Sequence, residues 1–171
     1  MKIVRTMMTL AFLLGACVMV RADEMKMAAP KPNPAFDQIK GLAGNWEGQA
    51  SDGKTAKISY QVVASGNVVM ETLDAADHSS MITMYHVDGG KLVMDHYCAM
   101  PNVPHMRGTL SADGKQIDFA FVSASNLSGP NDAHMHGLKV TFVDPTHFTQ
   151  EWSMRAEGKT TPVVFKFQKV G

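Results

Sequence analysis

The sequence predicts an all-β protein: a roughly ten-stranded antiparallel up-and-down barrel with a short N-terminal helix. Turn-forming residues recur at short intervals after residue 45, as in Asp88-Gly89-Gly90 and Asp144-Pro145-Thr146. The segments between these turns alternate apolar and polar residues, and none keeps a helical period. Sequential strands with short turns leave two exposed sheet edges unless the sheet closes on itself. A sandwich is the alternative, but the near absence of long crossovers favours a barrel.

Composition excludes several classes of protein. The chain has 171 residues, with 16 Lys and Arg against 16 Asp and Glu, so a basic face for nucleic acid is not expected. The hydrophobic share of 45% argues against disorder, and two cysteines cannot form a disulfide scaffold. The 14 Met and 7 His stand out, because both side chains can bind metal ions where the fold brings them together.

Residues 1–22 have the pattern of a secretory signal peptide. Lys2 and Arg5 precede an uncharged apolar run over residues 7–20, and Ala22 supplies a small residue for cleavage. This predicts an exported protein, periplasmic or secreted, with no transmembrane span in the mature chain. The alternative is a membrane-anchored lipoprotein, because residues 13–17 resemble a lipobox that ends at Cys17.

The remaining chain is expected to form a linker and one domain. Residues 23–33 contain Pro30 and Pro32 and are predicted to be a linker. Asn33 followed by Pro34 is typical of a helix start, which predicts a helix from residue 34 to about residue 42. The domain of residues 34–171 then holds all the strands.

The first predicted strand carries a family resemblance. Residues 42–48 read Leu-Ala-Gly-Asn-Trp-Glu-Gly, which resembles the Gly-x-Trp start of the calycins: lipocalins, fatty-acid-binding proteins and haem-binding nitrobindins. The form with ten strands is most similar to nitrobindin and related bacterial barrels. The resemblance implies a lipocalin-like barrel whose closed end holds Trp46. It does not place a haem-ligating His in this sequence.

Alternation assigns side chains to the barrel interior. In the segment that starts at His134, the residues His134, His136 and Leu138 share a face, which predicts that both His point inward. A symmetric turn at Asp144-Pro145-Thr146 would pair Leu138 with Trp152 and His136 with Met154. His96 and Cys98 likewise share a face of an earlier strand.

A metal site is one prediction from this placement. In a meander, the late part of an odd strand and the early part of an even strand lie at the same end. The mouth at that end is expected to hold His96, Cys98, His134, His136 and Met154, with Met81 as a lesser candidate. These side chains are ligands for copper or zinc.

A small-molecule site is the other prediction, since a barrel of this size can enclose an apolar ligand. The expected wall consists of Tyr60, Tyr85, Phe119, Phe121, Phe142, Gln150 and Trp152. Haem is a less favoured cofactor: an inward His could ligate it, but the sequence has no Cys-x-x-Cys-His motif for covalent attachment.

Catalysis is not favoured. His96 and Cys98 on one strand point in parallel rather than toward each other, and no nucleophile-elbow motif is present. The sequence therefore predicts an exported barrel that binds a small apolar molecule or cofactor. The alternative is copper or zinc bound at the His/Cys/Met mouth.

Overall fold

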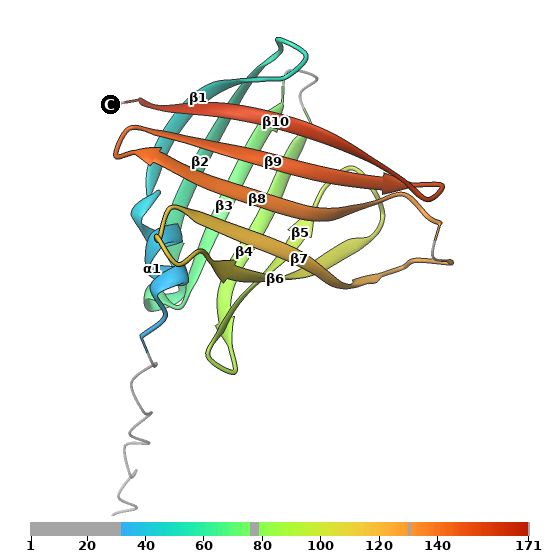
Figure 1. The fold of residues 1–171 in the computed structure, drawn as a ribbon, viewed down its shortest axis with the longest axis horizontal. Helices are drawn as coiled ribbons and strands as arrows, with labels where there is room; N and C mark the ends of the chain where they lie inside the picture. The colour runs from blue at the N-terminus through green and yellow to red at the C-terminus, as the bar shows by residue number, and fades with distance from the viewer. Residues whose placement is uncertain (1–31, 76–78, 130, 171) are drawn as a thin grey trace, which may run out of the picture. The chain divides into compact units, whose positions relative to one another are not determined.

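The prediction of an antiparallel barrel with a short helix is confirmed. The structure is a computed structural model that describes residues 32–75, 79–129 and 131–170. Within these residues the chain forms one α-helix, one short 3-10 turn and ten strands, which close into a barrel (Figure 1). The predicted signal peptide, the lipobox Cys17 and nearly all of the linker lie outside the described residues.

The elements follow each other with short connections. The helical segments are α1 (Pro34–Gly41) and η1 (Ala64–Gly66). The strands are β1 (Gly44–Ala50), β2 (Thr55–Val63), β3 (Val68–Ala75), β4 (Ser80–Asp88), β5 (Lys91–Tyr97), β6 (Val103–Leu110), β7 (Gln116–Ser125), β8 (His134–Asp144), β9 (His147–Ala156) and β10 (Lys159–Val170). Each strand pairs antiparallel with its neighbours in sequence, and β1 pairs with β10. This closure leaves no free edge in the sheet.

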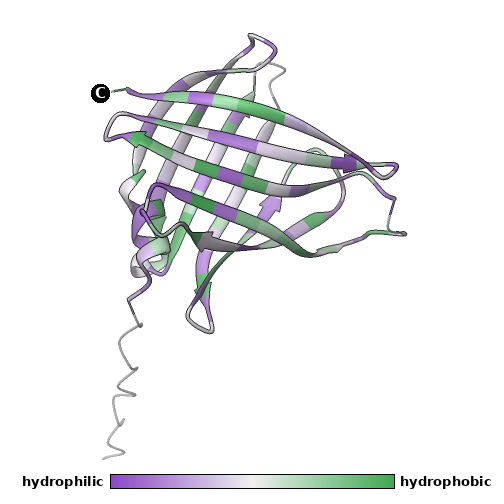
Figure 2. Cartoon of the chain, viewed as in Figure 1, coloured by the Kyte–Doolittle hydropathy of each residue, from purple (hydrophilic) through white to green (hydrophobic). Residues whose placement is uncertain are grey.

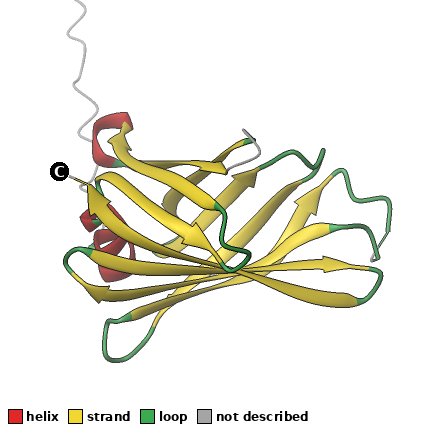
Figure 3. Ribbon diagram, turned by 90° about the horizontal axis from the view of Figure 1, so that it is seen from above, coloured by secondary structure: helices red, strands yellow, loops and turns green. Residues whose placement is uncertain are grey.

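The helix begins and ends as its sequence predicts. The Asn33 side chain accepts a hydrogen bond from Phe36 N, and Pro34 occupies the first turn, where its missing N–H costs nothing. The apolar residues Ala35, Phe36 and Ile39 are buried in the core. The helix therefore lies against one end of the barrel (Figure 3).

Aromatic side chains fill the barrel at the helix end. Trp46 Nε1 donates to Leu42 O at 2.8 Å, just beyond the helix. Its indole packs edge-on against Phe148 at 4.8 Å between centroids, and Phe148 stacks on Phe167. Trp46 is thus buried where the calycin resemblance implies. We call this the helix end, and the end where β9 turns into β10 the open end.

Alternation along the strands separates the interior from the surface. Bands of apolar and polar residues succeed one another along the ribbon (Figure 2). On β4 and β5 the predicted two-residue turn at Gly89-Gly90 is confirmed, and it pairs Thr83 with His96 and Tyr85 with Met94.

No helix among the described residues is long and apolar enough to span a membrane.

The predicted register of β8 and β9 is right in the middle of the hairpin and wrong toward the open end. Leu138 pairs with Trp152 as expected, but a β-bulge between Met135 and Gly137 leaves His136 without a partner and pairs Met154 with Met135. One extra residue reverses which side chains share a face. His136 and Leu138 therefore do not continue one regular face.

Candidate functional site

A cavity of about 150 Å³ lies inside the open end of the barrel. Its lining comes from strands that begin or finish there: Leu73, Met81, His96, Met135, Trp152, Val163 and Phe165. All but His96 and the indole N–H of Trp152 are apolar groups. The cavity lies at the mouth that the meander topology singles out, although its wall differs from both predicted sets of residues.

His96 is the polar residue of this wall, and one of its ring nitrogens is buried and unpaired. The residue is 1% exposed and its ring packs on Trp152, with centroids 4.4 Å apart. His96 Nδ1 lies 3.0 Å from Thr83 Oγ1, whereas the buried Nε2 has no hydrogen-bond partner among the described residues. Burial lowers the pKa of His96 from its ordinary 6.5 to about 4, so the imidazole is neutral at physiological pH.

A buried carboxylate lies one layer deeper in the barrel. Glu71 is 1% exposed and accepts hydrogen bonds from Tyr85 Oη at 2.7 Å, Gln150 Nε2 at 2.8 Å and Thr83 Oγ1 at 3.2 Å. Burial raises the pKa of Glu71, and hydrogen bonds from Tyr85, Tyr60, Gln150 and Thr83 oppose that rise. Donors of this kind favour the charged form of a buried carboxyl group.

We call the buried, hydrogen-bonded side chains around Glu71 the polar layer. It includes two tyrosines and the glutamine of the predicted ligand wall: Tyr60, Tyr85 and Gln150. Gln150 Nε2 donates to Tyr60 Oη at 2.8 Å, and Trp152 Nε1 donates to Gln150 Oε1 at 3.0 Å. The pKa values of Tyr60 and Tyr85 are raised well above the usual range, by burial first and then by the charge of Glu71. The polar groups of this layer form hydrogen bonds with one another, and Tyr60, Tyr85 and Gln150 are not among the residues that line the cavity.

The aromatic residues of the predicted ligand wall are divided between several places. Trp152 lines the cavity. Phe119 is buried against Tyr85, with ring centroids 5.5 Å apart. Phe142 is half-buried at the helix end of β8, and Phe121 is half-buried beside His134 and His136.

His134 and His136 do lie together, and among the described residues no group of three potential metal ligands joins them to His96. Their Nε2 and Nδ1 atoms are 3.0 Å apart, and both rings pack on Phe121. The β7–β8 ladder has its last pair at Ala120 and Gly137, so these three side chains occupy the place where the two strands separate. The pKa of His136 is lowered by burial and then by the charges of His134 and Arg155.

Two further members of the predicted metal set, Cys98 and Met154, lie near the ends of their strands. Cys98 is half-buried just after β5, and Met154 is half-buried on β9. Among the residues that the structure describes, no three His, Cys, Asp or Glu side chains are grouped so that they could share a metal ion. The meander topology also assigns the loop that carries His78 to this mouth, but His78 lies outside the described residues.

The sequence does not single out Glu71, Thr83 or Met135 as residues of the site. A signal for the first was present, because Glu71 falls between Val69 and Leu73 at strand spacing, on the face that those two apolar residues bury. Thr83 could have been found from its pairing with His96. Met135 could not, because its inward position depends on the bulge in β8.

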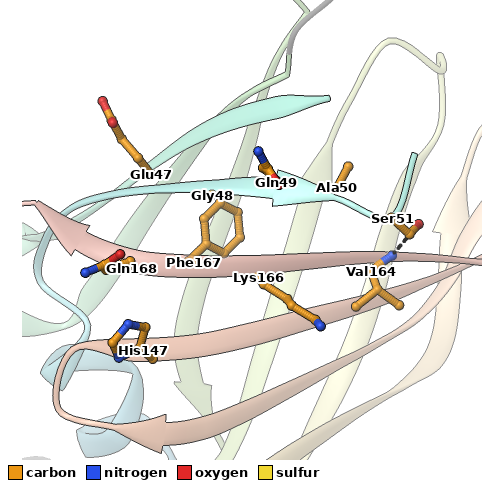
Figure 4. Close-up of a pocket in the computed structure, with 10 residues that line it drawn as sticks. All are labelled: Glu47, Gly48, Gln49, Ala50, Ser51, His147, Val164, Lys166, Phe167 and Gln168. Carbon is orange, nitrogen blue, oxygen red and sulfur yellow. Dashed lines mark hydrogen bonds between the residues drawn. The ribbon is translucent and has the colours of Figure 1, made fainter. Parts of the chain in front are cut away.

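A larger hollow of about 520 Å³ lies on the outside of the barrel, over β1 and β10 (Figure 4). Glu47, Gln49 and Lys166 on its wall are exposed, and their side chains do not converge on a common point. Val164 N donates to Ser51 Oγ at 3.4 Å across its rim. Most of the residues that line this groove are polar, whereas the wall of the inner cavity is almost entirely apolar, so we take the inner cavity as the candidate site.

Comparison with known proteins bears on the fold. No family model matches the chain, and a search of curated proteins found no match. Among solved structures, the chain is similar to Rv2717c from M. tuberculosis, with a TM-score of 0.57, 17% identity and coverage of 81% of this chain and 98% of that one.

A second solved structure is similar over most of this chain. It is a protein of unknown function from the DUF3598 family of Nostoc punctiforme PCC 73102, with a TM-score of 0.53 and 11% identity. The alignment covers 78% of this chain and 49% of that longer one. At these identities the two likenesses show a shared fold and nothing about ligands.

Proposed function

We propose that this protein is a binding protein that holds one small, largely apolar molecule inside the open end of its barrel. One observation carries the proposal: within the part of the chain that the structure describes, an apolar cavity of about 150 Å³ is lined by His96, whose buried Nε2 has no hydrogen-bond partner. Apolar pockets with few, well-placed polar groups are typical ligand sites. An apolar cavity of roughly this size holds one benzene-sized molecule.

The surroundings support a binder rather than an enzyme. The wall offers one neutral imidazole and otherwise apolar groups, and Cys98 is not among the lining residues. The polar layer beneath is closed by its own hydrogen bonds, which leaves it no group to donate to a reaction. Its fixed geometry supports the imidazole from below, so the wall is organised before a ligand arrives.

The experiment is a thermal-shift and calorimetric survey of one-ring aromatic probes. A ligand that binds only the folded state at ten times its dissociation constant stabilises it by about 1.4 kcal/mol, or roughly 4 °C for a domain of this size. Val163→Phe fills the cavity and is expected to abolish the shift. Val143→Thr is the matched control, because Val143 is 61% exposed outside the barrel.

Two results would contradict the proposed function. One is that no probe stabilises the wild-type protein at concentrations up to the millimolar range. The other is that Val163→Phe folds and still binds the probe with unchanged affinity, which would place binding elsewhere in the molecule.

We also propose that the barrel works outside the cytoplasm, as the pattern of residues 1–22 supports. The expected mature form starts at residue 23, or at a lipid-bearing Cys17. Cell fractionation with mass spectrometry of the mature N-terminus distinguishes these forms. Recovery of the full chain from the cytoplasm would contradict both.

A further inference from the structure

The hydrogen bonds of the polar layer run in a fixed direction that starts at Trp152. An indole N–H can only donate, so Gln150 must present its oxygen to Trp152 Nε1, 3.0 Å away. The amide nitrogen of Gln150 then faces Tyr60 Oη and Glu71 Oε2, both at 2.8 Å. Tyr85 Oη also donates to Glu71 Oε2. That oxygen of Glu71 is therefore an acceptor of two hydrogen bonds.

The other carboxylate oxygen determines the state of His96. Glu71 Oε1 accepts from Thr83 Oγ1 at 3.2 Å, and a hydroxyl group has only one hydrogen to donate. Thr83 Oγ1 must therefore accept from His96 Nδ1, 3.0 Å away. Because the imidazole is neutral, its only proton is on Nδ1, and Nε2 carries a lone pair.

We propose that the cavity selects a neutral, one-ring aromatic ligand that carries an O–H or N–H group, and that Glu71 sets this preference through Thr83 by holding His96 Nε2 as an acceptor. This inference rests on the proposed function and adds the chemical class of the ligand. The apolar wall takes the ring, and the donor of the ligand supplies the partner that the buried Nε2 lacks.

Size and charge both support this class. The cavity volume matches one aromatic ring, and the wall holds no charged group that would compensate a buried ion. His96 Nε2 is itself covered, so the ligand must displace wall atoms to reach it. The flexible side chains of Met81 and Met135, both at the starts of their strands, can give way.

Glu71→Gln tests the relay because it reverses the direction of the Thr83 link. Two donors, from Tyr85 and Gln150, will hold the new amide oxygen at the former Oε2 position. The new amide nitrogen then donates to Thr83 Oγ1. The Thr83 hydroxyl turns to donate to His96 Nδ1, and the imidazole proton moves to Nε2. The cavity then presents a donor instead of an acceptor.

The experiment compares three probes of similar size by calorimetry at pH 8: pyrrole, which only donates, pyridine, which only accepts, and benzene, which does neither. In wild type we expect pyrrole to bind roughly tenfold more tightly than benzene, and pyridine no better than benzene, because a buried acceptor left unpaired is costly. In Glu71→Gln we expect pyridine to bind more tightly than pyrrole. Val143→Thr, at a position 61% exposed outside the barrel, is the matched control and should keep the wild-type order.

A second readout does not depend on any ligand. Nitrogen-15 NMR of the His96 ring should show the proton on Nδ1 in wild type and on Nε2 in Glu71→Gln. Thr83→Val removes the link but keeps Glu71 itself, and it should reduce the preference for pyrrole even if Glu71→Gln fails to fold.

The outcomes separate this inference from the proposed function. Equal binding of all three probes to wild type, or a proton on His96 Nε2 in wild type, overturns the donor preference and leaves the binding function standing. Failure of every probe to bind overturns the proposed function and the ligand class with it.

Discussion

The rings of His96 and Trp152 pack together with centroids 4.4 Å apart and planes tilted by 41°. Both residues line the open-end cavity, and the indole N–H of Trp152 also donates to Gln150 in the polar layer. One pair of side chains thus links the candidate ligand site to the buried hydrogen-bond network.

Trp152→Phe should destabilise the protein and remove the optical signal of ligand binding. Loss of the indole N–H leaves Gln150 Oε1 buried without its donor, which costs about 1–3 kcal/mol in the free energy of unfolding. Urea unfolding measures this cost. Binding of a probe should change the tryptophan fluorescence of wild type and not that of Trp152→Phe; a retained change would assign the signal to Trp46.

Stability should fall in acid because of His96. Its pKa is lowered to about 4 by burial, from 6.5, so the unfolded chain takes up a proton first as the pH decreases. The stability that the neutral imidazole contributes is complete above about pH 6.5 and is lost as the pH falls to about 4. The shift corresponds to about 3 kcal/mol.

The measurement is the free energy of unfolding of wild type and His96→Phe across this pH range. The phenyl ring of His96→Phe can pack on Trp152 without titrating. Between about pH 6.5 and pH 4, wild type should therefore lose about 3 kcal/mol more of its free energy of unfolding than His96→Phe does. His86→Gln replaces a histidine outside the relay and should keep the wild-type slope. Parallel profiles for wild type and His96→Phe would contradict the assignment.

Tyr85→Phe should lower the free energy of unfolding by about 1–3 kcal/mol, because Tyr85 Oη donates to the buried carboxylate of Glu71 at 2.7 Å. Loss of this donor should also raise the pKa of Glu71 further. Tyr97→Phe is the matched control, since Tyr97 is 46% exposed. Equal denaturant midpoints for the two variants would show that the polar layer contributes little.

Gly48→Ala should be among the most damaging single substitutions in the barrel. A Cβ at Gly48 would lie 2.0 Å from the backbone oxygen of Lys166, on the strand that closes the barrel against β1. A backbone group cannot move aside as a side chain does, so we expect a loss of about 3 kcal/mol or more. Gly41→Ala, where a Cβ meets nothing within 4 Å, should be close to neutral in the same urea titration.

The strand order, the helix and the turns were accessible from the sequence because each depends on local chemistry. Asn33 and Pro34 begin the helix, and Gly89-Gly90 makes the turn that pairs Thr83 with His96. Alternation correctly placed Leu138, Trp152 and Gln150 inside. These features depend only on residues close together in the chain and on the alternation of side chains between the two faces of a strand.

The candidate site was only partly accessible. The cavity lies at the end of the barrel where the meander topology gathers His96 and Met81. Which side chains line it depends on the bulge at His136, which turns Met135 inward and puts His134 and His136 beside Phe121. A bulge moves the side chains on one side of it to the opposite face of the sheet. Where the bulge forms depends on contacts from several strands, which the local sequence does not contain.

The sequence by itself determined an antiparallel meander and a histidine on the inner face of β5, because strand periodicity and turn chemistry act over a few residues. Only the tertiary structure decided that Glu71, Thr83 and His96 form one hydrogen-bonded line below a cavity. Those three residues come from three strands, and their distances follow from the register and closure of the barrel. Whether His96 Nε2 accepts or donates is therefore a property of the closed barrel, since the proton on Nδ1 is held there by Glu71 through Thr83.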